Sequence, residues 1–167
     1  IPVLGAPMDS VVSPQTAIML GQLGGLGVLD LEGLWTRYDD PTPYLAEIAG
    51  LADVQATARM QQLYSAPIRP ELVTARLAEI RAAGVTVAGS LTPQRTQELY
   101  DTVAAAGVDL FVIRGTTVSA EHVSSVAEPL NLKKFIYDLF VPDDAAGTEI
   151  YTAALHLMRT GAAGVLV

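Results

Sequence analysis

The chain has 167 residues with a net charge of −8 and only ten lysines and arginines, which argues against a nucleic-acid-binding surface. Half of the residues are hydrophobic and the mean hydropathy is +0.36, as expected for a domain whose strands are buried on both faces. No cysteine is present, which excludes a disulfide, a thiolate metal site and a cysteine nucleophile within these residues. No apolar run reaches the roughly eighteen residues of a membrane span, and no signal peptide is visible.

The first 31 residues predict a strand, a loop, a helix and a second strand. An apolar run at residues 2–6 breaks at residues 7–10, and a helix then begins with Ser13 as N-cap and Pro14 in its first turn. The helix ends at Gly24, and another apolar run follows at once. Functional groups in such βαβ units gather at the carboxyl ends of the strands, so residues 7–10 are the first place to look for a site.

A helix that closes on glycine and leads directly into aliphatic residues recurs along the chain. Glycine tolerates the left-handed conformation that ends a helix, and serial helix-to-strand units build a parallel sheet. The sequence therefore predicts an α/β fold. These junctions lie at Gly24, Gly84, Gly107 and Gly161.

The remaining elements follow from periodicity and from proline, glycine and capping residues. The helix of residues 71–83 has the clearest apolar stripe, formed by Val73, Leu77 and Ile80. Residues 141–149 are predicted to be a loop, because they contain a proline, paired acids and little β-propensity. Other helices are predicted at 42–49, 52–63, 93–106, 119–126, 131–139 and 151–159, and strands at 85–91, 110–113 and from 165.

Several polar and aromatic residues have two interpretations. Asp9 either lies in a site at a strand end or caps the following turn. Trp35, with its neighbours Arg37 and Tyr38, either contacts substrate, or packs over the barrel mouth or in an oligomer contact, and packing is the favoured interpretation. Arg114 either binds a phosphate or pairs with a carboxylate, and the ion pair is favoured.

Two histidines and one pair of acidic residues show no pattern that indicates catalysis or metal binding. His122 and His156 both lie in predicted helices, away from strand ends and without the spacing of metal ligands, so a surface or packing role is favoured. Asp143 and Asp144 are most simply a solvated turn. The sequence predicts no metal site.

Several stretches in order resemble the IMP dehydrogenase / GMP reductase family, in particular its branch without the CBS regulatory module. The resemblance covers essentially the whole chain. It implies a (β/α)8 TIM barrel, of which residues 1–167 span about the first six units. We therefore expect one partial catalytic domain, truncated at both ends and with a degenerate fifth strand. The stretches that carry the resemblance are residues 7–11, 24–28, 31–38, 118–124 and 151–161.

The resemblance also implies site residues. Met8 matches a methionine that contacts the nucleotide in the family, which makes Met8 and Asp9 the predicted substrate-binding residues. Arg114, Gly115 and Thr116 stand where dehydrogenases of the family place an aspartate and two serines around the nicotinamide ribose. Gly147 is what remains of a glycine pair, which completes the predicted cofactor-binding set. The family's catalytic cysteine lies beyond Val167, so no catalytic residue is predicted here.

The implied function is that of a segment of a purine-nucleotide oxidoreductase that transfers a hydride between a purine 5′-monophosphate and a nicotinamide cofactor, NAD or NADP. The segment is expected to be inactive alone. The alternative is a non-catalytic, truncated or degenerate homologue with a structural or assembly role. We further expect a cytoplasmic homo-oligomer, and the charge and the absence of a long apolar run predict that it binds neither nucleic acid nor membrane.

Overall fold

The fold is built on a parallel sheet. The computed structural model describes residues 3–114, 121–122 and 130–131. Within them the sheet has the strand order β1-β2-β3-β4, and every neighbouring pair is parallel. The strands are β1 (Leu4–Gly5), β2 (Leu26–Asp30), β3 (Ala88–Leu91) and β4 (Leu110–Ile113).

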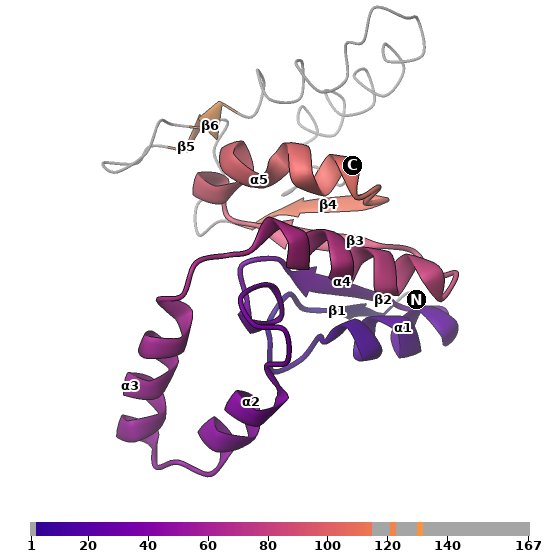
Figure 1. Cartoon of the computed structure of the whole chain (residues 1–167). Helices are drawn as coiled ribbons and strands as arrows, with labels where there is room; N and C mark the ends of the chain where they lie inside the picture. Colours follow the sequence, from indigo (N-terminus) through magenta and orange to yellow (C-terminus); the bar gives the residue numbers. More distant parts are fainter. Residues whose placement is uncertain (1–2, 115–120, 123–129, 132–167) are drawn as a thin grey trace, which may run out of the picture.

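Helices connect the parallel strands and lie side by side on one face of the sheet, as Figure 1 shows. The predicted α/β fold is therefore confirmed for the described residues, which have the arrangement of consecutive units of a (β/α)8 barrel. The connecting helices are α1 (Pro14–Gln22), α4 (Pro70–Ala82) and α5 (Pro93–Ala105).

The ends of α1 follow the predicted capping chemistry. The Ser13 hydroxyl oxygen accepts a hydrogen bond from the N–H of Thr16 at 3.0 Å, and Pro14 is in the first turn. Gly24 follows the helix with φ of +83°, a conformation that strains residues with a Cβ. Gly84 and Gly107, which follow α4 and α5, also have positive φ angles. These three glycine junctions are therefore confirmed.

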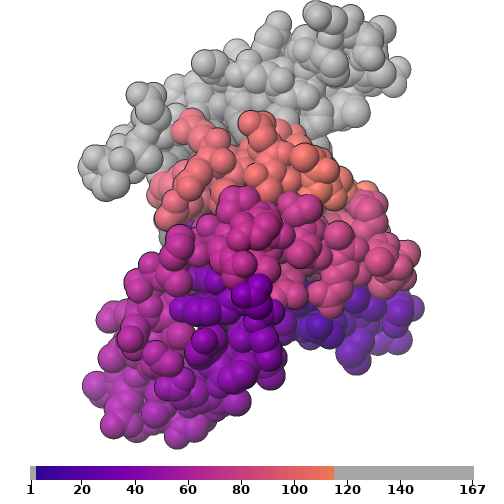
Figure 2. Space-filling view, in the orientation of Figure 1, coloured from indigo at the N-terminus to yellow at the C-terminus, as the bar shows by residue number. Residues whose placement is uncertain are grey.

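A helical hairpin projects from the sheet between β2 and α4. After a short 3-10 helix, η1 (Leu34–Thr36), the chain forms α2 (Thr42–Ala49) and α3 (Asp53–Tyr64). We call residues 42–64 the arm. Figures 1 and 2 show it standing away from the sheet at the lower left. No residue of α2 is buried, and Leu63 is the single buried residue of α3.

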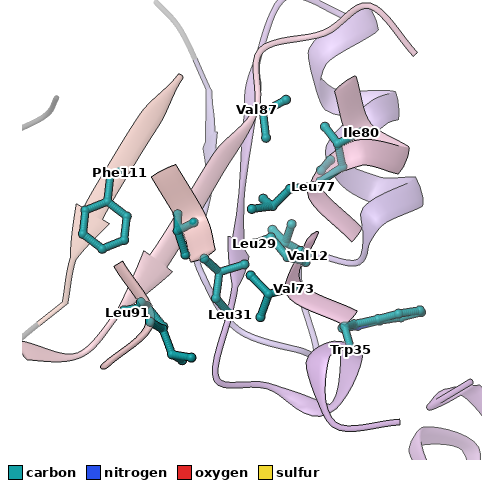
Figure 3. Close-up of a cluster of buried hydrophobic side chains, with 13 residues drawn as sticks. Val12, Leu29, Leu31, Trp35, Val73, Leu77, Ile80, Val87, Leu91 and Phe111 are labelled. Atoms are coloured by element: carbon teal, nitrogen blue, oxygen red, sulfur yellow. The ribbon is translucent and has the colours of Figure 1, made fainter. Parts of the chain in front are cut away.

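The hydrophobic core fills the space between the sheet and its helices. Figure 3 shows strand and helix side chains gathered there, with the predicted stripe of α4 fully buried. Gly27 permits the close approach of α1, because a Cβ at this position would lie 2.5 Å from the Cα of Ala17. The buried cluster consists of Val12, Ala17, Leu29, Leu31, Trp35, Val73, Leu77, Ile80, Val87, Leu91, Leu99, Val103 and Phe111.

Two short strands correct the sequence prediction. Residues 121–122 form β5 (Glu121–His122), which pairs antiparallel with β6 (Leu130–Asn131). The predicted helices at 119–126 and 131–139 are therefore wrong at these residues, and His122 lies in a strand. Ser119 resembles a helix cap, but a serine before a short segment also favours turns and extended backbone, so it does not establish a helix start.

Two boundaries also differ from the sequence prediction. β3 begins at Ala88 rather than at residue 85, because the N–H of Val87 donates to the side chain of Asp109 at 2.8 Å instead of joining the ladder. Thr42 is the first residue of α2 rather than its cap, and its own N–H donates to the Asp40 carboxylate at 3.0 Å. The predictions for residues 132–167, including the degenerate fifth strand and His156, lie outside the described residues.

In the part of the chain that the structure describes, no helix has the length and apolar character needed to cross a membrane.

Replacing Leu77 by alanine tests the core. Leu77 is fully buried in α4, so Leu77→Ala should lower the free energy of unfolding by about 2–5 kcal/mol. The same substitution at Leu23, which is 84% exposed, should change it by less than about 0.5 kcal/mol. Urea denaturation of both variants gives the comparison, and equal losses would contradict this core.

Candidate functional site

The carboxyl ends of β1, β2 and β4 bring polar residues to one edge of the sheet. The loop Pro7–Asp9 follows β1, Asp30 is the last residue of β2, and Arg114 comes directly after β4. Because parallel strands point the same way, residues that follow them meet at a common edge. The candidate site lies here, and we call it the carboxyl edge.

Arg114 connects three of the four strands. Its Nη1 donates to the carbonyl oxygen of Pro7 at 2.9 Å and to Oδ2 of Asp30 at 3.1 Å. Its Nη2 donates to Oδ1 of Asp30 at 3.0 Å, so the contact with the carboxylate is bidentate. The side chain thus reaches from β4 past β3 to β2 and to the loop after β1. The structure forms the ion pair, which is the alternative that the sequence favoured.

Asp30 is the buried partner of this pair, with 7% of its surface exposed. Burial raises the pKa of its carboxyl group, while hydrogen bonding to the N–H of Glu32 and the charge of Arg114 oppose that rise. The Glu32 N–H donates to Oδ1 of Asp30 at 3.0 Å. Asp30 is therefore held by the turn that follows it as well as by Arg114.

Ser90 lies on the strand next to Asp30. It is the register partner of Asp30 on the neighbouring strand, and register partners project their side chains to the same face. Ser90 is fully buried, and within the described part of the chain its hydroxyl has no hydrogen-bond partner. A buried hydroxyl of this kind is uncommon in native proteins, and with Asp30 it makes this face of the sheet polar.

Asp9 reaches across to the loop after β2. Its Oδ2 accepts the N–H of Leu34 at 2.7 Å and the hydroxyl of Tyr64, the last residue of the arm. A Cβ on Gly33 would lie 2.0 Å from its Oδ1, so only glycine fits there. Asp9 thus lies at the carboxyl edge, and the Oδ2 contacts go to the loop after β2 and to the arm rather than to the turn that follows Asp9.

Met8 is exposed in the loop after β1. Oδ1 of the neighbouring Asp9 is buried, whereas Met8 is 48% exposed. Its backbone is ordered by a tight turn, because its carbonyl oxygen accepts the N–H groups of Val11 and Val12 at 2.9 Å. The carboxyl edge therefore carries an exposed thioether on a fixed backbone.

The aromatic loop after β2 packs against the body, as the sequence favoured. Trp35 is 9% exposed, and the guanidinium of Arg76 lies 5.8 Å from its ring centre. Arg37 donates to the carbonyl of Glu32 at 3.0 Å. The Tyr38 hydroxyl donates to the carbonyl of Leu63 at 3.0 Å, which ties the end of the arm to this loop.

Tyr64 connects the arm to the carboxyl edge through its hydrogen bond to Asp9. Burial and the hydrogen bond to Asp9 both raise the pKa of its phenol, so the hydroxyl stays protonated and remains a donor across the neutral range. The guanidinium of Arg37 lies 5.7 Å from the ring centre. The position of the ring is thereby fixed from a second side.

Three of the predicted cofactor-binding residues, Gly115, Thr116 and Gly147, lie outside the described residues. The described ranges contain no group of three or more potential metal ligands. The predicted residues that the structure brings together are Met8, Asp9 and Arg114, all at the carboxyl edge.

Sequence reasoning missed Asp30, Ser90 and Tyr64. The rule that pointed to residues 7–10 also applied to Asp30, because an acid at the end of an apolar strand stands at the same edge. Ser90 has no distinguishing sequence signal. Tyr64 lies 55 residues from Asp9, and nothing in the local pattern links them.

Taken together, the fold and the carboxyl edge define consecutive units of a (β/α)8 barrel with polar groups at the end of the strands where such barrels carry their sites. A solved structure, an IMP dehydrogenase/GMP reductase-like protein from Corynebacterium glutamicum, matches 97% of this chain with a TM-score of 0.78 and 40% identity. The predicted resemblance to the IMP dehydrogenase / GMP reductase family is confirmed by this match.

Curated relatives agree with this assignment. Proteins of Mycolicibacterium smegmatis and Mycobacterium tuberculosis, each named an uncharacterized oxidoreductase, are 51% identical to the chain over 172 residues. All of this chain is matched, but it spans 46% of each relative and 43% of the solved C. glutamicum chain. No family model matches the sequence.

Neutralising Asp30 tests the ion pair at the carboxyl edge. Asp30→Asn leaves the Arg114 guanidinium, whose side chain is 36% exposed, without its carboxylate, and should lower the free energy of unfolding by about 1–2 kcal/mol.

The control is Asp39→Asn at the surface, where the Asp39 side chain is 78% exposed and is one of two carboxylates that pair with Arg69, the other being Glu71. Urea denaturation at pH 7 should show no measurable change for this variant. Equal effects of the two substitutions would contradict a structural role specific to the Asp30 pair.

Proposed function

We propose that the protein containing this chain is a purine-nucleotide oxidoreductase of the IMP dehydrogenase / GMP reductase type. In such an enzyme a hydride passes between a purine 5′-monophosphate and NAD or NADP. The observation that carries the proposal is the match to the C. glutamicum protein over 97% of this chain. The name of the mycobacterial relatives, oxidoreductase, supports the reaction class.

Within this chain, Met8 is the proposed nucleotide contact. It is the exposed residue of a loop at the carboxyl edge, and its flanking residues are each held by hydrogen bonds from other elements. A thioether packs well against a planar purine ring. Asp9 belongs to the proposal as the residue that fixes this loop, since its Oδ2 already receives two donors.

The described residues fit a nicotinamide cofactor poorly. Arg114 is the described member of the predicted cofactor set, and its guanidinium is engaged by Asp30 and by the Pro7 carbonyl. It supplies donors where a ribose diol is held best by an acceptor carboxylate. The contacts of NAD or NADP are therefore proposed for Gly115, Thr116 and Gly147.

The 167 residues contain no cysteine, so the thiolate that attacks the purine in the proposed chemistry must come from outside this sequence. We propose that this chain is one partial barrel domain that binds and orients the nucleotide and is inactive alone. A cytoplasmic homo-oligomer belongs to the same proposal and is supported by the resemblance alone.

The engaged guanidinium of Arg114 favours a second candidate, a degenerate homologue that keeps the fold but does not bind the cofactor. Nucleotide binding separates the two. An enzyme of the proposed type binds IMP or GMP and produces or consumes reduced cofactor, which absorbs near 340 nm, whereas a degenerate homologue does neither.

The test uses the full-length protein and two methionine variants. Met8→Ala should weaken the affinity for IMP or GMP about tenfold in calorimetric titration, because a methionine contact with the purine is lost. Met19→Ala is the matched control, since Met19 is 61% exposed on α1, and it should leave affinity unchanged.

Absence of binding to the unaltered protein would overturn the proposed function. Binding that Met8→Ala and Met19→Ala affect equally would leave the function standing and remove Met8 from the site.

A further inference from the structure

Both neighbours of Met8 are fixed by residues from distant parts of the chain. On one side, the Pro7 carbonyl accepts from Arg114, which follows β4. On the other, the Asp9 carboxylate accepts from the N–H of Leu34 and from the hydroxyl of Tyr64. The exposed side chain of Met8 therefore stands on a backbone that is clamped at both ends.

The Tyr64 side of this clamp comes from the arm. Tyr64 is the last residue of α3, and the adjacent Leu63 carbonyl accepts from the Tyr38 hydroxyl at 3.0 Å. Arg37 donates to the nearby carbonyl of Ala66 and lies over the Tyr64 ring. These contacts set the position of the Tyr64 ring independently of Asp9. The base of the arm, residues 63–66, therefore holds the Tyr64 hydroxyl beside the Asp9 carboxylate.

The Asp9 carboxylate depends on these donors for its orientation. Its Oδ1 lies buried against Gly33 without a hydrogen-bond partner among the described residues, and the contacts from Leu34 and Tyr64 both go to Oδ2. Charge-assisted hydrogen bonds of this kind are stronger than neutral ones, and a part-buried carboxylate that loses a donor tends to turn toward another. Removing the Tyr64 hydroxyl would leave the Leu34 N–H as the remaining contact of Oδ2.

We propose that Tyr64 is a positioning residue that fixes the loop carrying Met8 through the carboxylate of Asp9, and that the arm thereby controls the geometry of the nucleotide-binding loop. The ligand class, a purine 5′-monophosphate, rests on the proposed function. The positioning itself does not, because the contacts that produce it are present without a ligand.

The base of the arm is well anchored while the remainder has few contacts. No residue of α2 is buried, and Val54 near the start of α3 is 85% exposed. Figure 2 shows this part of the arm standing clear of the sheet. A displacement of the arm therefore reaches the carboxyl edge through Tyr64, the arm residue that contacts Asp9.

The experiment replaces single hydroxyl groups on the arm of the full-length protein. Tyr64→Phe removes the donor to Asp9 and keeps the ring over which Arg37 lies. Tyr44→Phe is the matched control, because Tyr44 is on the same arm, packs its ring 4.7 Å from that of Tyr38, and has no hydroxyl hydrogen bond within the described residues.

The first readout needs no nucleotide. In protein labelled at the methionine methyl groups, the Met8 signal, assigned with Met8→Ala, should shift and broaden in Tyr64→Phe and stay in place in Tyr44→Phe. Asp9→Asn, which keeps the shape of the side chain but removes its charge, should move the same signal. An unmoved Met8 signal in both Tyr64→Phe and Asp9→Asn would overturn the inference.

The second readout is the affinity for IMP or GMP. Tyr64→Phe should weaken it about tenfold, and Tyr44→Phe should leave it unchanged. Equal affinities of Tyr64→Phe and the unaltered protein would overturn the inference while leaving the proposed function intact. A protein that binds neither nucleotide would overturn the proposed function, and the methyl signal of Met8 would still decide whether Tyr64 positions the loop.

Discussion

The ion pair between Arg114 and Asp30 is the constraint on which the carboxyl edge depends. A parallel sheet is held by its ladder bonds and by the helices on one face, but its loops are otherwise independent. Arg114 joins them, because one guanidinium contacts the end of β2 in bidentate fashion and the loop after β1 at the same time. The buried Asp30 needs that charge, since burial alone disfavours its ionised form. The geometry of the first loop is therefore set by a residue more than 100 positions away.

A second constraint meets the first at the same loop. Asp9 receives the Leu34 N–H and the Tyr64 hydroxyl, and the absence of a side chain at Gly33 makes room for its carboxylate. Met8 lies between the two fixed points and is exposed. This combination of a rigid backbone and an accessible side chain is what a binding loop requires, because ordering a mobile loop would reduce affinity. The arm thus contributes Tyr64 to the contacts of the carboxyl edge.

Much of the fold could be predicted from the sequence because its signals are local. Ser13 with Pro14 marks the start of α1, and the glycine junctions at Gly24, Gly84 and Gly107 mark helix ends. The apolar stripe that includes Leu77 identifies the buried face of α4. The antiparallel pair of β5 and β6 was missed because a serine before a short segment resembles a helix cap whether or not a helix follows. The candidate site could be predicted only in part. Met8 and Arg114 could be identified from the resemblance. Tyr64 and Ser90 could not, because only contacts between distant elements place them at the carboxyl edge.

The most direct test of the central claim is a double-mutant cycle at Asp30 and Arg114, using Asp30→Asn, Arg114→Gln and the combined variant in urea denaturation. The structure places both guanidinium nitrogens within hydrogen-bonding distance of the carboxylate, so the two substitutions should be coupled by about 1 kcal/mol or more. In that case the double variant loses clearly less stability than the sum of the single variants. Strictly additive losses would mean that the two residues act independently, and the carboxyl edge would then not depend on this ion pair.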